Sequence, residues 1–344
     1  MPTEHVTIEE IESQPAALEA VLESLGAVES ELAETLSADS TFCLVGCGTS
    51  YYLAQSGSAV LNEVASSVAI PGSEALISPD QLPDEVDVVV PVSRSGESTE
   101  TVRATEALTE RYPDATVCGV TCTEGSAIEN LADVPIVSPE GSEESVVMTK
   151  SFSSMLVAFE YVARVIETGG ESTVADDFRS LPADSEQVVS SAGDVARELG
   201  EGGFEKSFFL GSGEHVGLAS EAMLKLEEMT LSWTKAYHAL EFRHGPQSIA
   251  DENTLVTVFL PDRRLELYAD LLDDIADLGA TSLVVGTSES LEEVTADHVV
   301  EIPDREFGSL PLYAPPFQLL GYYKAVANDL NPDEPQNLTQ VVTL

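Results

Sequence analysis

The chain has 344 residues, of which 43% are apolar, and this is enough for one large α/β domain or for two domains. Its formal net charge of −46 leaves no basic face, so we expect no nucleic-acid partner. The N-terminus "MPTEHVTIEE" has no secretory-signal pattern, and no run approaches the ~20 apolar residues of a membrane span. We therefore expect a cytoplasmic protein with no membrane partner.

The acidic residues are spread along the whole chain. There are 61 Asp and Glu against 15 Lys and Arg, and they fall within well-patterned segments instead of forming one tail. An acidic surface of the ordinary kind is one interpretation. The scarcity of lysine favours the other, a halophilic protein adapted to a salt-rich cytoplasm, where mutual repulsion between carboxylates is screened.

The first half of the chain alternates between predicted strands and helices. Residues 7–36 predict two helices split near Gln14-Pro15, and the apolar runs "TFCLVG", "SSVAI", "VDVVVPVS", "ATVCGVT" and "DVPIVSP" then predict strands with helices between them. Buried strands separated by helices are typical of a parallel sheet covered on both faces. The polar segment "TGGESTVADDFRSLPADSE" ends this half near residue 168.

The second half repeats the same order. "KSFFLGSGEHVGLASEAMLKLEEM" parallels "TFCLVGCGTSYYLAQSGSAVLNEV", each a strand, a G-x-G turn and a helix. The fold class we predict is α/β, with two tandem flavodoxin-like units, each a parallel sheet flanked by helices. The predicted divisions are N-terminal helices, first unit, linker, second unit and tail, over residues 1–36, 37–168, 169–195, 196–330 and 331–344.

Four cysteines stand in two C-x-x-x-C pairs, Cys43 with Cys47 and Cys118 with Cys122. This spacing is compatible with metal ligation, but both pairs lie in or just after apolar strands with no histidine nearby. We expect buried, reduced thiols and no metal. The turn "GCGTSYY" has Tyr51 in place of the third glycine of a dinucleotide fingerprint, so we expect no NAD and no other cofactor.

A hydroxyl-rich turn, "PVSRSGEST", follows the predicted strand at residues 87–93. In a parallel sheet such a turn lies at the carboxyl ends of the strands, where helix N-termini bind oxyanions. We therefore expect a phosphate site formed by Ser93, Arg94, Ser95 and Ser98, with Thr49 and Ser50 facing the same crevice. The alternative is that a serine of this turn serves as an ordinary helix cap. The second half has "FLPDRRLEL" at the matching place, and the loss of the serines from one copy favours a ligand in the other.

A third group of polar residues lies in "SEAMLKLEEMTLSWTKAYHALEFRHGP". Glu221, Lys225 and Glu228 fall on one face of the predicted helix. They form either a solvent-exposed ion-pair stripe or a functional group of charges. His244, before Gly-Pro, is either a local hydrogen-bonding residue or a catalytic one.

Several motifs, taken in their order along the chain, resemble those of one family. "CGTSY", "VSRSGES", "MTKSF" and "EAMLKLEEMT…HALEFRHGP" resemble the sugar isomerase (SIS) family, in particular the isomerase half of glutamine–fructose-6-phosphate aminotransferase and the related aminosugar-phosphate deaminases and isomerases. The opening "EEIESQPAAL" resembles the start of that half, so the resemblance covers nearly the whole chain.

The resemblance implies a role for each matching residue. Ser50, Ser93, Arg94, Ser95 and Ser98 would hold the phosphate of a sugar-phosphate substrate, although the family often has glutamine at the place of Arg94. The backbone around Val146 would face the sugar, Glu228 would be the general base, and Lys225 would lie beside it. His244 would open the sugar ring, donated by the other subunit of a homodimer with shared active sites. The tail over residues 331–344 would cover the active site.

Two departures from the family pattern direct the functional prediction. The chain begins "MPTEH", without the N-terminal cysteine of the glutaminase half, and Gln340 stands where the synthases have an imine-forming lysine. We therefore expect a deaminase and isomerase acting on an aminosugar phosphate such as glucosamine-6-phosphate. The alternatives are amination of fructose-6-phosphate without an integral glutaminase domain, and a non-catalytic sugar-phosphate sensor.

Overall fold

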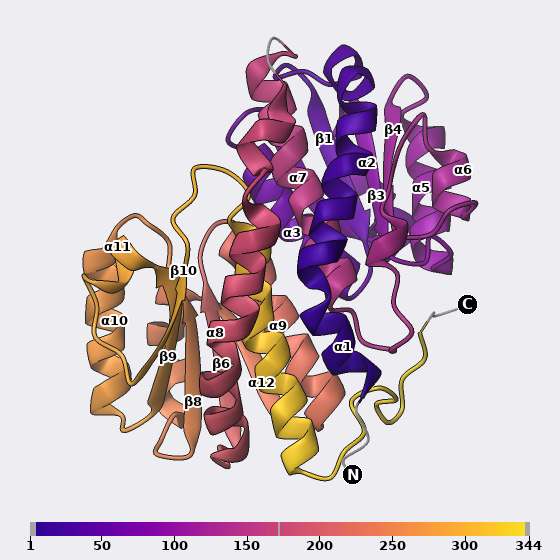
Figure 1. The fold of residues 1–344 in the computed structure, drawn as a ribbon. Helices are drawn as coiled ribbons and strands as arrows, with labels where there is room; N and C mark the ends of the chain where they lie inside the picture. Colours follow the sequence, from indigo (N-terminus) through magenta and orange to yellow (C-terminus); the bar gives the residue numbers. More distant parts are fainter. Residues whose placement is uncertain (1–4, 171–172, 341–344) are drawn as a thin grey trace. The chain divides into compact units, whose positions relative to one another are not determined.

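The computed structural model describes residues 5–170 and 173–340, and these form two compact units (Figure 1). The β1 unit takes in the described residues of 15–143, 150–182 and 339–344. The β6 unit takes in those of 1–14, 144–149 and 183–338. Each unit has its own sheet and its own core.

The β1 unit is built on a parallel sheet with the strand order β2-β1-β3-β4-β5. Its strands are β1 (Thr41–Gly46), β2 (Ser66–Pro71), β3 (Val88–Ser93), β4 (Thr116–Thr121) and β5 (Val134–Val137). Its α-helices are α2 (Gln14–Thr35), α3 (Thr49–Leu61), α4 (Gly72–Ile77), α5 (Thr99–Arg111), α6 (Ala127–Leu131) and α7 (Lys150–Thr168). Short 3₁₀ turns are η1 (Pro79–Gln81), η2 (Pro139–Gly141) and η3 (Val174–Phe178).

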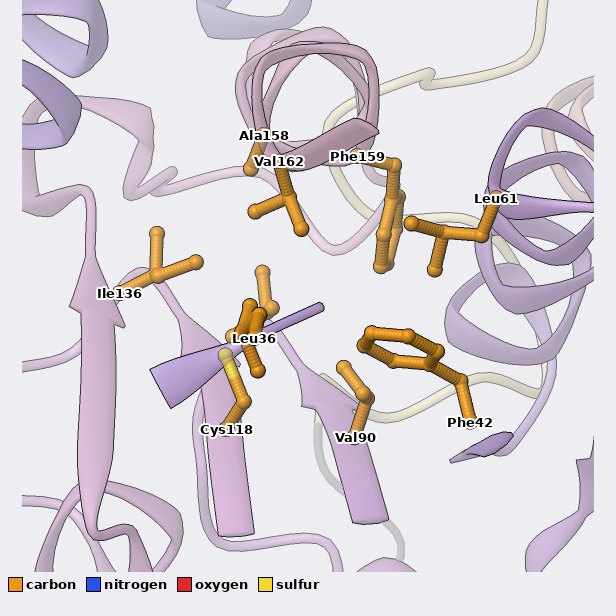
Figure 2. A pocket seen from close by; sticks show the side chains of 10 residues that line it. Leu36, Phe42, Leu61, Val90, Cys118, Ile136, Ala158, Phe159 and Val162 are labelled. Atoms are coloured by element: carbon orange, nitrogen blue, oxygen red, sulfur yellow. The ribbon is translucent and has the colours of Figure 1, made fainter. Parts of the chain in front are cut away.

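Alternate side chains of β1 pack on opposite faces of this sheet. Cys43 and Val45 cluster with Ala104 and Leu108 of α5 on one face. On the other face α7 lies over the strands, and Figure 2 shows a small cavity there. Its lining is apolar throughout: Leu36, Phe42, Leu61, Val90, Cys118, Val120, Ile136, Ala158, Phe159 and Val162. The cavity therefore belongs to the core and offers no polar group to a substrate.

The β6 unit has a second parallel sheet, with the strand order β10-β9-β8-β6-β7. Its strands are β6 (Lys206–Gly211), β7 (Trp233–His238), β8 (Thr254–Phe259), β9 (Thr281–Thr287) and β10 (His298–Ile302). Its α-helices are α1 (Val6–Glu12), α8 (Leu181–Glu201), α9 (His215–Thr230), α10 (Leu265–Asp277), α11 (Ser288–Leu291) and α12 (Ala314–Ala327). Its 3₁₀ turns are η4 (Ala239–His244), η5 (Pro246–Ile249) and η6 (Leu310–Tyr313).

The core of the β6 unit also has two sides. Phe208 and Val256 cluster with Leu271 and Ile275 of α10 on one face of the sheet. On the other face α9 and α12 pack together, and the ring of Phe259 lies 6.0 Å from that of Phe317 on α12. The unit is therefore a sheet between two layers of helices, as its apolar strands predicted.

The two sheets have the same topology. Read from β7, the second order is β7-β6-β8-β9-β10, which repeats β2-β1-β3-β4-β5 strand for strand. This is the flavodoxin-like order, and the prediction of two tandem α/β units is confirmed. No helix among the described residues is long and apolar enough to cross a membrane.

The segment predicted as a linker, residues 169–195, contains among its described residues η3 and the beginning of the long helix α8. The buried stripe of α8 is Leu181, Ser185, Val188, Ala192, Ala196 and Leu199. Because half of these side chains are small or polar, the helical period was hidden in a segment rich in Ser, Asp and Glu.

The end of the chain has no regular structure over residues 331–340. The tail predicted over residues 331–344 lies partly outside the described residues, and Gln340 is its last described member. The peptide N–H of Thr7 and its hydroxyl both donate to Oδ1 of Asp333 at 2.8 Å, which ties the first part of this segment to α1.

Candidate active site

Two turns of the β1 unit lie at the carboxyl edge of its sheet. β1 and β3 are neighbouring strands, and each runs directly into a helix, α3 or α5. The hydroxyl of Thr101, in the first turn of α5, donates to Sγ of Cys47 at 3.6 Å, so the two turns approach one another. Two helix N-termini of the same unit therefore meet at one edge, which favours binding of an anion.

The turn after β1 places Thr49 and Ser50 at the start of α3, and both are buried. The helix passes very close to the end of the strand here. A Cβ added to Gly46 would lie 2.5 Å from the carbonyl oxygen of Ser50. Only glycine at this position allows so close an approach, which brings the hydroxyl pair to the sheet edge.

The turn after β3 is held by its own serines. The hydroxyl of Ser93 accepts from the N–H of Gly96 at 3.1 Å and donates to Ser98 at 3.4 Å. Ser95 accepts from the N–H of Glu97 at 3.2 Å. Ser98 is the N-cap residue of α5, yet its side chain makes no capping hydrogen bond. The alternative that this serine serves as an ordinary helix cap is therefore not realised.

Arg94 is engaged by other residues of the β1 unit. It is 8% exposed, and its Nη1 lies 3.2 Å from Oε2 of the buried Glu143. Its Nη2 donates to the carbonyl oxygen of Gln340 at 3.3 Å, and Nε2 of Gln340 donates to the carbonyl oxygen of Glu143 at 3.1 Å. The guanidinium therefore connects the hydroxyl turn with the last described residue of the tail.

Sequence reasoning did not find Glu143. Its carboxylate also accepts from the N–H and the hydroxyl of Ser151, at 3.1 and 2.5 Å, in the first turn of α7. In a chain with 61 Asp and Glu, nothing in "PEGSEES" marks this carboxylate as the buried one. Only the folding of the chain brings this carboxylate next to Arg94.

The β6 unit carries the second group of predicted residues. Glu221 and Lys225 on α9 are fully buried, with side-chain exposures of 0% and 1%. Nζ of Lys225 lies 3.4 Å from Oε1 of Glu221 and donates to Oε2 of Glu228, whose side chain is 19% exposed. The alternative of a solvent-exposed stripe is therefore excluded. One buried ammonium holds two carboxylates, and only the second of them reaches the surface.

His244 and Val146 belong to the same unit as Glu228. His244 is the last residue of η4 and is exposed, followed by Gly245 with φ 130° and by Pro246. Val146 is half-buried, and its N–H donates to the carbonyl oxygen of Asp333 at 3.2 Å. The predicted residues thus form two groups, one in each unit. That they act on one substrate is part of the function proposed below.

The cysteines have the environment of core residues. Cys43, Cys118 and Cys122 are buried and Cys47 is half-buried, all with free thiols. Burial raises the pKa of Cys43 and of Cys118 to about 12, so these thiols stay protonated and are poor metal ligands. Within the described part of the chain, no three His, Cys, Asp or Glu side chains are grouped to hold a metal ion.

Comparison with known proteins identifies the family. The SIS domain matches residues 36–164. The crystal structure of glucosamine-6-phosphate deaminase from Thermotoga maritima shares 30% sequence identity with a TM-score of 0.80, and the match covers 98% of this chain and 99% of that one. The chain belongs to the SIS family.

Two further similar proteins bear on the extent of the match. Glutamine–fructose-6-phosphate aminotransferase (isomerizing) of Pyrobaculum aerophilum is 28% identical over 351 residues, which cover 99% of this chain and 58% of the relative. The chain thus spans somewhat more than half the length of that protein. The C-terminal domain of glucosamine-fructose-6-phosphate aminotransferase from Francisella tularensis has the same fold, with a TM-score of 0.83, 22% identity and coverage of 97% of this chain and 99% of that one.

Proposed function

We propose that this SIS-family chain is an enzyme that deaminates and isomerises glucosamine-6-phosphate or a close isomer, giving a ketose phosphate and ammonia. The observation that carries the proposal is the buried ammonium of Lys225 between Glu221 and Glu228. A group of charges of this kind is costly to bury, and its one partly exposed member, Glu228, is a carboxylate that can act as a base. The 30% identity with glucosamine-6-phosphate deaminase over almost the whole of both chains supports the choice of substrate.

In this proposal the carboxyl edge of the β1 sheet binds the phosphate. Ser93, Ser95 and Ser98 supply hydroxyls beside the N-terminus of α5, and Thr49 and Ser50 supply two more at α3. Helix N-termini and neutral hydroxyl donors together bind an oxyanion without a cluster of basic residues. Arg94 lies at the same turn, but its charge is offset by the buried Glu143, so the hydroxyls and the helix N-termini are the main donors to the phosphate.

The chemistry requires one base and a fixed substrate. In the open-chain aminosugar phosphate, Glu228 removes the proton on C2, which is acidic because C1 is an aldehyde. The resulting enolamine is protonated on C1 and becomes an imine at C2. Water adds to this imine, the C–N bond breaks, and ammonia and the ketose phosphate leave. Lys225 donates to Oε2 of Glu228 and so holds the carboxylate in place.

Ring opening is assigned to His244. Its side chain is exposed at the end of η4, held by a turn with Gly245 and Pro246, and so is available to a neighbouring molecule. We propose that a second copy of the chain receives this histidine, giving a homodimer in which each active site is shared. This part of the proposal rests on the family resemblance together with the exposure of the residue.

The two alternative functions, amination of fructose-6-phosphate and sugar-phosphate sensing, would require different residues. Amination of fructose-6-phosphate would run the same proton transfer in reverse, with ammonia supplied from outside the chain. Gln340, whose side chain is an amide and cannot form an imine with a keto sugar, weighs against it. A sugar-phosphate sensor would need the turn of the β1 unit but not the buried charges of α9, so their presence favours an enzyme.

The test is ammonia release in concentrated KCl from a panel of hexosamine 6-phosphates, with wild type, Glu228→Gln and the control Glu227→Gln. Glu227 is the adjacent half-buried carboxylate and carries the same charge change. Loss of the base is expected to lower kcat by about 10²–10⁴-fold while the dissociation constant of the sugar phosphate stays near that of wild type. Glu227→Gln should remain close to wild type in both.

Three outcomes would contradict this function. Equal losses of binding and turnover in Glu228→Gln would make the residue structural. Faster formation of hexosamine phosphate from fructose-6-phosphate and ammonium than its breakdown would favour the amination alternative. Tight binding of sugar phosphates with no turnover by wild type would favour the sensor.

A further inference from the structure

Residues 144–149 change unit within the chain. They lie between η2 and α7, which both belong to the β1 unit, yet this six-residue segment packs in the β6 unit. The segment has no helix or strand of its own. Its backbone groups must therefore find hydrogen-bond partners on other elements, and these partners determine where it lies.

Glu10 on α1 supplies the first of these partners. Although it is charged, it is only 6% exposed. Oε1 accepts from the N–H of Glu144 at 2.6 Å and from the N–H of Ser145 at 3.3 Å, and Oε2 accepts from the hydroxyl of Ser145. A buried carboxylate is tolerated when it is hydrogen-bonded, so the helix and the segment hold one another in place.

Two more hydrogen-bond partners of the segment come from the C-terminal part of the β6 unit. The carbonyl oxygen of Asp333 accepts from the N–H of Val146 at 3.2 Å, and its carboxylate accepts from Thr7 on α1. Nε2 of Gln318, which is fully buried on α12, donates to the carbonyl oxygen of Thr149 at 3.1 Å. The segment is thus hydrogen-bonded to other elements of the unit at its beginning, middle and end.

The anchored segment touches the helix that carries the proposed base. Val147 is 1% exposed and clusters with Met229 of α9 and Ala325 of α12. Met229 directly follows Glu228 in the sequence. A shift of the segment would therefore be passed to the last turn of α9, or would open a gap beside it.

We propose that Glu10 is a positioning residue, whose carboxylate fixes residues 144–149 against the end of α9 and so sets the backbone of Val146 beside Glu228 for the sugar end of the substrate. The inference rests on the proposed function and deepens it. Glu10 itself touches neither phosphate nor proton. A change at Glu10 affects the rate of the proton transfer, which depends steeply on geometry, and leaves the affinity of the β1 unit for phosphate unchanged.

The test compares Glu10→Gln with Glu9→Gln and with Ser145→Ala. Glu9 is exposed on the same helix and controls for the loss of one charge. Glu10→Gln removes the negative charge that strengthens the bonds from the N–H groups of Glu144 and Ser145, and its amide nitrogen cannot accept from the hydroxyl of Ser145, which can turn to the carbonyl oxygen of Val147 at 3.0 Å. Ser145→Ala removes the hydroxyl, with its bonds to Glu10 and Val147, and leaves the carboxylate. We measure kcat and KM for glucosamine-6-phosphate, the dissociation constant of inorganic phosphate, and amide hydrogen exchange over residues 144–149.

We expect kcat of Glu10→Gln to fall by about 10- to 100-fold, with faster exchange of the segment and unchanged phosphate affinity. Ser145→Ala should lose a smaller factor, and Glu9→Gln none. Turnover by Glu10→Gln equal to that of Glu9→Gln would overturn the inference, as would a parallel loss of phosphate affinity. If Glu10→Gln does not fold, Ser145→Ala with wild-type kcat overturns it. Absence of turnover in wild type would instead overturn the proposed function, and the inference with it.

Discussion

The two buried ammonium groups of Lys225 and Lys324 have different kinds of partner. Lys225 has two carboxylate partners. Lys324, 5% exposed, donates to the carbonyl oxygen of Phe204 at 2.7 Å and lies over its ring, and burial lowers its pKa. Neutral partners suffice to pack a lysine into a core. The pair of carboxylates around Lys225 therefore exceeds what packing requires, which is why we place the chemistry there.

His215, at the start of α9, is a second kind of buried ionisable group, with 4% exposure. Its ring lies 4.5 Å from that of Tyr313, and Nδ1 lies 3.8 Å from Oε1 of Glu214. Burial lowers its pKa from 6.5; Glu214 and Asp262 oppose this shift, and Arg263 adds to it. The folded protein therefore holds the imidazole neutral at a pH where an unfolded chain would protonate it.

Stability should consequently fall as the pH is lowered through the ordinary histidine range. Because the pKa is lower in the folded state, the unfolded state binds the extra proton first, and the loss begins near pH 6.5. Urea midpoints at constant salt, measured between about pH 7.5 and pH 5.5, should decrease in wild type and change less in His215→Phe. His238→Phe, the same substitution at an exposed position, is the control. Equal slopes in all three proteins would mean that His215 does not titrate differently on folding.

The turn between β3 and α5 depends on Gly96. Its φ is +66°, and an added Cβ would lie 2.2 Å from Oγ of Ser126 and 3.0 Å from Oγ1 of Thr121. Gly125 has a similar φ of +71° but open space around it. The two glycines therefore separate backbone strain from steric crowding.

Gly96→Ala should destabilise the protein more than Gly125→Ala. Both substitutions cost about 1–2 kcal/mol for the left-handed backbone, and only Gly96→Ala adds about 1–3 kcal/mol for the clash. Because the clash displaces the serines of the turn, KM for a sugar phosphate should rise in Gly96→Ala alone. Thermal unfolding and steady-state kinetics measure both effects. An unchanged KM in a folded Gly96→Ala would remove the turn from the phosphate site.

The matching turn of the second sheet shows why the two copies differ. After β8 the chain carries Asp262 and Arg263 in place of serines. Asp262 accepts from the hydroxyl of Thr287 at 2.5 Å, and Arg263 pairs with Glu214 at 2.9 Å. These charged groups are satisfied within the β6 unit itself. What distinguishes the copies is the presence of the serines, which favours a ligand at the hydroxyl turn.

Sequence reasoning predicted elements better than it predicted partners. The strands were predictable because runs such as "VDVVVPVS" are apolar throughout, and Gln14-Pro15 was predictable as the break between α1 and α2. The spacing of Glu221, Lys225 and Glu228 gave their shared face but not their burial. Glu10 and Glu143 had no signal, because their burial depends on partners such as Glu144 and Arg94, which lie more than 40 residues away along the chain. Local pattern does not carry that information.

The net charge of −46 determines how the stability of the protein depends on salt. Most carboxylates lie on the surface with too few cations to pair with them, since the chain has only 15 Lys and Arg. At low ionic strength their repulsion acts over many ångströms and disfavours the compact state. At about 1 M salt the screening length falls to about 3 Å, shorter than most distances between surface charges.

The melting temperature should therefore rise when KCl is increased from about 0.1 M to about 2 M, and NaCl at equal ionic strength should act alike, since screening does not depend on the cation. A variant that removes two exposed carboxylates of α5, Glu106→Gln with Glu110→Gln, should melt higher than wild type in dilute buffer and approach it in concentrated salt. Differential scanning fluorimetry across the salt series measures both. A melting temperature independent of salt would show that repulsion among the carboxylates does not destabilise the folded state. A stabilisation specific to K⁺ would point to bound ions in place of a diffuse atmosphere, because only a coordinated cation distinguishes K⁺ from Na⁺ by size.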